Sequence, residues 1–308
     1  MGSGGGGGYS GTYSSGDLAR KTRESEDKAQ NQAFISTVNE YLDEKLGEYN
    51  SRDCELIRSI IEEFQSNLND EDYSAIQTIF GGSVSKHTYV DGLSDVDALI
   101  LIDRKHLENK APNEIRDLLG ELAVNKYGKE NVTIGNMAIT ISVQGNTIQL
   151  LPALKHGANY KISSPDGSKW SSIKPREFTE KLTSINKATN NKAIPTIKLA
   201  KAIISNLPSQ QQLSGYHVES LAVRIFNEYK GPYTNKEMLS HFFSKDGEVV
   251  KTRLQDRTGQ STYVDEYLGS PHNVKRRTTA NALDRISRSI KNADGHFSIE
   301  KWRSLFDE

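Results

Sequence analysis

The segment that most constrains this chain runs from Gly81 to Asp103, with the sequence GGSVSKHTYVDGLSDVDALILID. It begins with a Gly-Gly-Ser turn and crosses a polar loop. It ends in an apolar run, Ala98 to Ile102, that predicts a buried β-strand. Asp95 and Asp97 stand at the entry to that strand, and residues i and i+2 of a strand share a face. We therefore expect both carboxylates to point the same way.

This pair of acids predicts a metal site. Two carboxylates held side by side repel each other unless a cation lies between them. Mg²⁺ takes oxygen ligands and usually keeps a substrate phosphate in its shell. The backbone N–H groups of the Gly82-Ser83 turn, with the Ser83 hydroxyl, suit a phosphate chain. We therefore expect Mg²⁺ or Mn²⁺ at Asp95 and Asp97, beside a phosphate-binding turn.

A Gly-Ser turn followed by hydrophobic-Asp-x-Asp-hydrophobic resembles the signature of the DNA polymerase β-like nucleotidyltransferases. The sequence motif GGSVSKHT…GLSDVDALI is similar to that of the oligoadenylate synthetases and cyclic GMP-AMP synthases. It is most similar to their bacterial relatives, the CD-NTases of CBASS anti-phage systems. The resemblance implies an α+β fold, in which a polymerase β-like nucleotidyltransferase lobe with a mixed sheet precedes a helical C-terminal lobe.

Composition and hydrophobic periodicity divide the chain into three parts. Residues 1–22 are rich in Gly and Ser and are expected to form a flexible tail. Residues 23–174 are expected to form the catalytic lobe with its N-terminal helices. Residues 175–308 have helical patterns and are expected to complete the nucleotide pocket.

Within the expected catalytic lobe, apolar spacing predicts two helices over 25–69 and a third over 113–127. Alternating patterns predict a strand over 132–143 and, after a Gln-Gly-Asn hairpin turn, its partner over 147–154. Residues 156–175 are polar and Gly-rich, and we expect a connecting loop there.

One position departs from the family pattern. In these families a third acid precedes a Pro-Ala pair by three residues and ligates the metal that activates the attacking hydroxyl. Here TIQLLPAL places Gln149 at that position. A Gln amide binds Mg²⁺ more weakly than a carboxylate and cannot act as a base. Three explanations stay open: the site tolerates Gln149, a nearby acid replaces it (Asp91, Asp103 or Asp166), or the chain is impaired.

The helical part carries further motifs. PTIKLAKAI resembles the helix whose lysine reaches the triphosphate, which implies that role for Lys201 and, in second place, Lys198. LSGYHVESLAVRIF resembles an element that supplies a phosphate-binding serine and a base-stacking tyrosine, here Ser214 and Tyr216. A core aromatic is the open alternative for Tyr216. Glu219 either contacts a base edge or pairs with a basic neighbour. Residues 256–269 resemble the loop that closes the donor side of the pocket.

The composition of the chain excludes several classes of binding partner and site. Lys plus Arg number 39 and Asp plus Glu 40, a net charge of −1, which argues against bulk nucleic acid as an obligate partner. The single cysteine excludes an internal disulfide and a cysteine zinc site. No apolar run reaches membrane-spanning length and no secretory signal is visible. We expect a soluble, cytoplasmic protein with no membrane partner.

The resemblance implies a nucleotidyltransferase that joins nucleoside triphosphates into a cyclic di- or trinucleotide, with pyrophosphate release. The product would activate a separate effector in anti-phage defence. Two alternatives stay open: an RNA-directed nucleotide-adding transferase, and an impaired nucleotide-binding sensor, which Gln149 favours. The expected catalytic residues are Asp95, Asp97 and Gln149. The expected nucleotide-binding residues are Gly82, Ser83, Lys198, Lys201, Ser214 and Tyr216.

Overall fold

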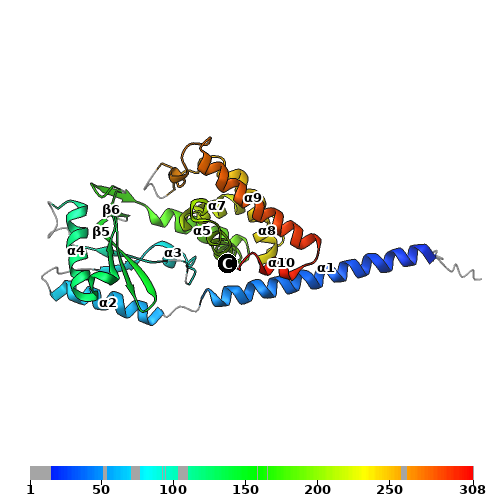
Figure 1. Cartoon of the computed structure of the whole chain (residues 1–308), viewed down its shortest axis with the longest axis horizontal. Helices are drawn as coiled ribbons and strands as arrows, with labels where there is room; N and C mark the ends of the chain where they lie inside the picture. The colour runs from blue at the N-terminus through cyan, green and yellow to red at the C-terminus, as the bar shows by residue number, and fades with distance from the viewer. Residues whose placement is uncertain are drawn as a thin grey trace, which may run out of the picture.

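The protein has a sheet-containing lobe and a helical lobe (Figure 1). The structure is a computed structural model that describes residues 15–50, 54–70, 77–91, 93, 95–102, 110–157, 159–164, 166–257 and 262–307. Two large hydrophobic clusters form separate cores, one in each lobe. Among these residues, no helix is long and apolar enough to cross a membrane.

The sheet is mixed. Its order is β1-β2-β5-β4-β3, and β6 pairs with both β5 and β7. β2 and β5 run parallel, whereas every other described pair is antiparallel. The strands are β1 (Gln77–Phe80), β2 (Val96–Leu101), β3 (Val132–Ile134), β4 (Ile139–Val143), β5 (Asn146–His156), β6 (Asn159–Ser163) and β7 (Trp170–Ile173). The mixed sheet confirms the expected fold class.

The two faces of β2 pack against different parts of the protein. Ala98 and Ile100 pack against α2 (Cys54–Asp70) and α4 (Pro112–Tyr127) in the core of the sheet lobe. Leu99 and Leu101 belong to a smaller apolar cluster on the opposite face. Since side chains alternate along a strand, Asp97 shares the face of Leu99, away from α2 and α4.

The helical lobe packs around long apolar stripes. Phe178, Ile197, Leu221, Phe242 and Leu283 come from five different helices and lie in one buried cluster. Its helices are α5 (Pro175–Ala188), α6 (Ala193–Ser205), α7 (Gly215–Phe226), α8 (Asn235–Val250), α9 (Val274–Gly295) and α10 (Ile299–Arg303).

The first helix differs from the expectation. α1 (Ser15–Glu48) begins inside the segment expected to be a flexible tail, of which residues 1–14 lie outside the described residues. Its apolar residues Phe34, Val38, Tyr41 and Leu42 join the core of the helical lobe, not that of the sheet lobe. Residues 19–33 are exposed, and α1 projects beyond the helical lobe (Figure 1).

Two predictions of local structure were wrong. Residues 156–175 contain the hairpin β6–β7, because Ile162 and Ile173 give each strand an apolar anchor. The expected strand over 132–143 is interrupted, and β3 and β4 form an antiparallel hairpin. Gly135 donates its N–H to Ala138 O at 2.9 Å and closes the turn between them. The alternation of apolar residues across this turn imitated a single strand.

Candidate active site

Gly82 and Asp97 are in close contact. The turn after β1 forms a short helix, α3 (Gly82–Ser85), and Gly81 N–H donates to Asp97 O at 2.8 Å. Gly82 has φ +48°, and a Cβ there would lie 1.5 Å from Asp97 Oδ2. The backbone N–H of Ser83 hydrogen-bonds the Asp97 carboxylate. Only glycine at position 82 lets the turn approach this carboxylate so closely.

Asp95, Asp97 and Gln149 meet at the start of β2. Asp97 and Gln149 are register partners on the parallel strands β2 and β5. The amide nitrogen of Gln149 donates to Asp95 Oδ2 at 2.5 Å. Gln149 therefore lies beside the two acids, as its position before the Pro-Ala pair indicated. Its amide N–H orients the Asp95 carboxylate.

The described acids considered as substitutes for Gln149 lie outside the lining of its cavity. Neither Asp91 nor Asp166 lines the cavity that contains Gln149. Ser164 and Ser168 donate to Asp166 in the β6–β7 turn, which lowers its pKa to about 2. Asp103 lies outside the described residues.

Burial raises the pKa of the Asp97 carboxyl to about 6. The positive charge of Lys86 opposes this shift, and the negative charge of Asp95 adds to it. Within the described residues, no three His, Cys, Asp or Glu side chains gather as a metal cluster. Two carboxylates nevertheless fit Mg²⁺, since that ion is commonly held by one or two carboxylates together with substrate phosphates.

These residues open into a cavity of about 510 Å³ between the lobes. The sheet lobe contributes Gly82, Ser83, Asp95, Asp97 and Gln149, and the helical lobe contributes Lys201, Ser214 and Tyr216. Lys198 is not among the lining residues, and its Nζ donates to Asn50 Oδ1. The structure thus brings together every candidate residue except Lys198.

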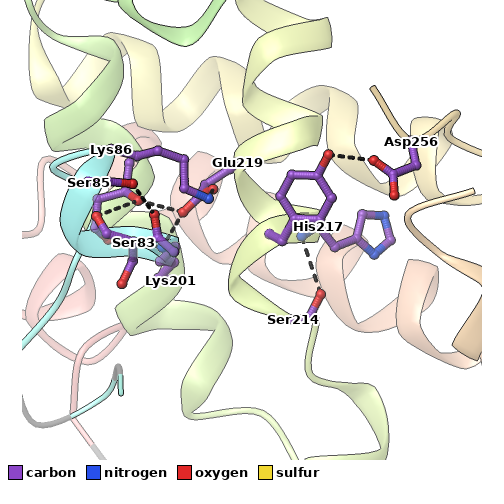
Figure 2. Close-up of polar contacts among 11 residues, drawn as sticks. Ser83, Ser85, Lys86, Lys201, Ser214, His217, Glu219 and Asp256 are labelled. Atoms are coloured by element: carbon purple, nitrogen blue, oxygen red, sulfur yellow. Dashed lines mark hydrogen bonds and ion pairs between the residues drawn. The ribbon is translucent and has the colours of Figure 1, made fainter. Parts of the chain in front are cut away.

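A buried ion cluster joins the lobes beside this cavity. Glu219 is 1% exposed and contacts the ammonium groups of Lys86 and Lys201 (Figure 2). Lys201 Nζ lies 2.8 Å from Glu219 Oε1 and 2.9 Å from Thr88 O. The Thr88 hydroxyl also donates to Glu219 Oε1, at 2.5 Å. Lys86 and Thr88 belong to the sheet lobe, whereas Lys201 and Glu219 belong to α6 and α7.

The charges in this cluster stabilise one another. Burial alone would raise the pKa of Glu219, but Lys201 and Lys86 hold it below its usual value. Burial lowers the pKa of Lys201, and Glu219 opposes that effect. Two ammonium groups and one carboxylate leave one net positive charge for an anionic ligand. The sequence analysis did not single out Lys86; a Glu inside the apolar stretch VESLAVRIF was the available signal, since a buried carboxylate needs cationic partners.

The N-terminus of α7 forms the wall opposite the acids. Ser214 caps this helix by accepting the N–H of His217 at 3.3 Å. Tyr216 packs its ring edge-on against Phe178, with centroids 5.0 Å apart, and donates its hydroxyl to Asp256 at 2.8 Å. Tyr216 therefore lines the cavity and also packs against the core. Its position is compatible with stacking on a base and with a core role.

The loop after α8 supports this wall from behind. Arg276, fully buried, bonds the carbonyls of Val250 and Thr252 and the carboxylate of Asp265. Tyr267, on the short helix η4 (Glu266–Leu268), accepts the Ser214 N–H at 3.1 Å. Within the expected donor-side loop, residues 258–261 lie outside the described residues.

A Gly-Ser turn against a strand aspartate, on a mixed sheet that faces a helical lobe across a cavity, defines the polymerase β-like nucleotidyltransferase fold. Residues 36–186 match the family described as Second Messenger Oligonucleotide or Dinucleotide Synthetase domain. This match covers just under half of the chain and agrees with the CD-NTase resemblance that the motifs predicted.

Known relatives agree with the fold. The chain is 22% identical over 191 residues to the cyclic AMP-AMP-AMP synthase of an Acinetobacter species, and this match covers 59% of the chain but 55% of that protein. The CD-NTase CdnG of Bradyrhizobium diazoefficiens, solved with GTP, has a TM-score of 0.63 at 10% identity, covering 80% of this chain and 88% of that one. CdnC of Escherichia coli MS115-1, solved with ATP, has a TM-score of 0.57 at 16% identity, covering 82% and 90%.

Proposed function

We propose that this chain is a divalent-metal-dependent nucleotidyltransferase that joins nucleoside triphosphates into a cyclic oligonucleotide. One observation carries the proposal: the Gly82-Ser83 turn, the Asp95–Asp97 pair and the N-terminus of α7 all face one cavity. The name of the Acinetobacter relative supports a cyclic product. By analogy with CBASS systems, we propose that the product acts on a separate effector in the cytoplasm.

The phosphate chain of a donor nucleotide fits between the two lobes. Ser83 offers its hydroxyl from one side of the cavity. The N-terminus of α7, next to Ser214, carries the positive end of the helix dipole from the other side. Lys86 and Lys201 line the same space with one net positive charge after Glu219 is counted. These groups orient the phosphate chain of the nucleotide so that pyrophosphate can leave in line with the incoming hydroxyl.

Asp95 and Asp97 are the residues that would hold the divalent cation. That cation, when bound, supplies charge neutralisation at the transferred phosphorus and on the leaving pyrophosphate. The chain's own part is to fix these carboxylates: the Ser83 N–H orients Asp97, and the Gln149 amide orients Asp95. Gln149 has no basic atom that can take the proton of the attacking ribose hydroxyl.

A specific contact favours a second candidate, an impaired nucleotide-binding sensor with the same pocket. The Gln149 amide nitrogen occupies one oxygen of Asp95, and an N–H group cannot ligate a cation. Such a protein would bind a nucleoside triphosphate through the same residues and release no pyrophosphate.

One assay separates the candidates. Labelled ATP, CTP, GTP and UTP are incubated with the protein and Mg²⁺ or Mn²⁺, and the products are treated with phosphatase. Discrete phosphatase-resistant products support the cyclic oligonucleotide synthase, and RNA-dependent labelling supports an RNA-directed transferase. Nucleotide binding without products supports the sensor. The double variant Asp95→Asn plus Asp97→Asn must lose any product; undiminished synthesis would refute the proposed site.

A further inference from the structure

A second cavity lies on the helical lobe between α9 and α10, and every side chain that lines it can donate a hydrogen bond. Its volume is about 480 Å³, and its lining residues are Arg285, Arg288, Ser289, Asn292, Lys301 and Ser304. We call it the α9–α10 hollow. It shares no lining residue with the active-site cavity. α10 and the end of α9 lie on the side of the helical lobe away from the sheet (Figure 1).

The residues of the hollow form one continuous face. Arg285, Arg288, Ser289 and Asn292 are three, four and seven positions apart on α9, so they share one side of that helix. Lys301 approaches from α10, and its Nζ donates to Asn292 Oδ1, which ties the two helices together across the hollow.

Among the described residues, none of the cations of the hollow has an acidic partner. On an ordinary solvated helix face, a cation often has an acid four positions away. Here Arg285 and Arg288 are followed at that distance by Ser289 and Asn292. Asp284 lies four positions before Arg288, but its carboxylate faces Gly247 on α8, and it makes no ion pair with Arg288 among the described residues. The acids near the hollow are engaged elsewhere, since Asp294 pairs with Lys236 and Glu300 pairs with Arg303.

Neutral amides orient two of the three cations without cancelling their charge. Arg285 donates to Gln211 Oε1 at 3.1 Å, and Lys301 donates to the Asn292 amide. Arg288 has no hydrogen bond or ion pair with any described residue. Three like charges held around one concave surface repel one another, and a bound anion would relieve that repulsion.

We propose that the α9–α10 hollow is a second binding site, for a small polyphosphate anion of the nucleoside triphosphate class. Guanidinium groups present forked donors that match phosphate oxygens, and the Ser and Asn side chains complete the donor set. The volume falls in the range of ordinary small-ligand sites. A nucleic acid backbone is a poorer match, because it needs an extended track of cations, whereas these donors gather around one compact hollow.

The hollow also has a direct connection to the active site. Gln211, the partner of Arg285, ends the short helix η3 (Ser209–Gln211). The next residues, Gln212, Leu213 and Ser214, line the active-site cavity. An anion that draws Arg285 away from Gln211 would loosen this segment. Occupancy of the hollow would therefore change turnover at the active site, a second step that rests on the proposed function.

Binding is tested with inorganic tripolyphosphate by isothermal titration calorimetry without divalent cations. The background is the Asp95→Asn plus Asp97→Asn protein, so no turnover is needed. In that background we expect two binding events, one at the active-site cavity and one at the hollow. Arg288→Ala should weaken only the second, about tenfold, through the loss of one charge-assisted contact. Arg277→Ala is the matched control: it lies on the same helix, carries the same charge and does not line the hollow. It should change the affinity by less than about twofold, because exposed charges are screened.

Two results of this titration would overturn the site. One is the absence of any tripolyphosphate binding that Arg288→Ala weakens. The other is an equal loss in Arg277→Ala and Arg288→Ala, which would mean general surface charge. A parallel titration uses a single-stranded RNA of about 20 nucleotides. RNA binding that is tighter than tripolyphosphate binding and is weakened by both substitutions would replace the small-anion site with a nucleic acid track.

The connection to the active site has its own readout. Pyrophosphate release by the otherwise wild-type protein is measured against tripolyphosphate concentration, with and without Arg288→Ala. A response that differs between the two proteins supports the connection through Gln211. Identical responses would refute the connection while leaving the binding site in place. A protein that releases no pyrophosphate refutes the proposed activity and the connection, but not the binding measured by calorimetry.

Discussion

The amide nitrogen of Gln149 lies 2.5 Å from Asp95 Oδ2, so a neutral donor holds the carboxylate that the family pattern would pair with a third acid. This contact satisfies Asp95 in the absence of a cation. It also lowers the negative charge available to a cation, compared with a site of three carboxylates.

Gln149→Asp should make the stability of the protein depend on Mg²⁺. Three carboxylates without a cation repel one another, so we expect a lower melting temperature than wild type in EDTA. A tighter Mg²⁺ site should raise the melting temperature as the Mg²⁺ concentration increases, with a logarithmic dependence on that concentration. Differential scanning fluorimetry with and without Mg²⁺ measures both effects. Gln149→Ala is the control, because it removes the amide without adding charge. A Gln149→Asp protein no more responsive to Mg²⁺ than Gln149→Ala would contradict the placement of the metal.

Gly82→Ala should disable the turn that we propose binds phosphate. The new Cβ would overlap Asp97 Oδ2 at 1.5 Å, and φ +48° costs a residue other than glycine about 1–2 kcal/mol. We expect the turn to move away from Asp97 and nucleotide affinity to fall at least about tenfold. Gly81→Ala is the neighbouring control, since its Cβ meets Leu99 at an ordinary 3.6 Å and its φ is −110°. Binding of a fluorescent non-hydrolysable ATP analogue is measured; an equal loss in both variants would reject this explanation.

Part of this geometry was readable from the sequence, because it depends on local spacing. The Gly-Ser and Asp-x-Asp motifs predicted that Gly82 lies near Asp97, and the Pro-Ala pair predicted that Gln149 lies beside the acids. The structure places Gly82 against Asp97, and Asp97 and Gln149 are register partners on β2 and β5. The mixed sheet and the helical lobe also followed from periodicity and resemblance. Lys201, Ser214 and Tyr216 do line the cavity, but their roles toward a nucleotide stay predictions.

The features that the sequence did not predict depend on contacts that sequence spacing does not encode. Glu219 and Lys86 are 133 positions apart, and only the closure of one lobe on the other brings them together. Lys198 and Lys201 share the helix motif, yet Lys198 contacts Asn50 near the end of α1. The hairpin β6–β7 was hidden by its polar composition, since each strand has only a few apolar anchors.

Glu219→Gln should destabilise the contact between the lobes. It keeps the shape of the side chain but removes the carboxylate that Lys86 and Lys201 both contact. Breaking a buried pair in this way costs about 3 kcal/mol or more in unfolding free energy. We expect a lower unfolding midpoint in urea at neutral pH. The additional change Lys86→Met should restore part of the loss, because it removes one uncompensated charge. A double variant less stable than Glu219→Gln alone would contradict this account of the cluster.

The same residue predicts a response to acid. Lys201 and Lys86 hold the pKa of Glu219 below its ordinary value of 4.5, so its stabilising effect is present above that pH. It is lost as the pH falls through the lower folded-state value. Urea unfolding followed downward from pH 4.5 should therefore show a loss of stability in wild type that is smaller in Glu219→Gln. Parallel pH profiles for the two proteins would show that other carboxylates dominate acid unfolding.

Asp246→Asn should stabilise the helical lobe at neutral and higher pH. Asp246 is fully buried; Gly247 N–H donates to its Oδ1 at 2.7 Å, and its Oδ2 has no partner among the described residues. Burial, with the added charge of Asp284, raises its pKa well above 3.8. A raised folded-state pKa gives stability that is complete below the unfolded value and is lost as the pH rises through the folded value.

The neutral amide of Asp246→Asn removes that loss. The gain in unfolding free energy should therefore be about 1 kcal/mol or more at about pH 8, and smaller at about pH 4. Asp284→Asn is the matched control. It removes the neighbouring charge but keeps the buried carboxyl, so it should give a smaller gain with the same pH dependence. Chemical unfolding at the two pH values measures both variants. An Asp246→Asn protein that is less stable than wild type at the higher pH would contradict this account. It would mean that the ionised carboxylate has a partner there, because a buried charge is tolerated only when it is paired or hydrogen-bonded.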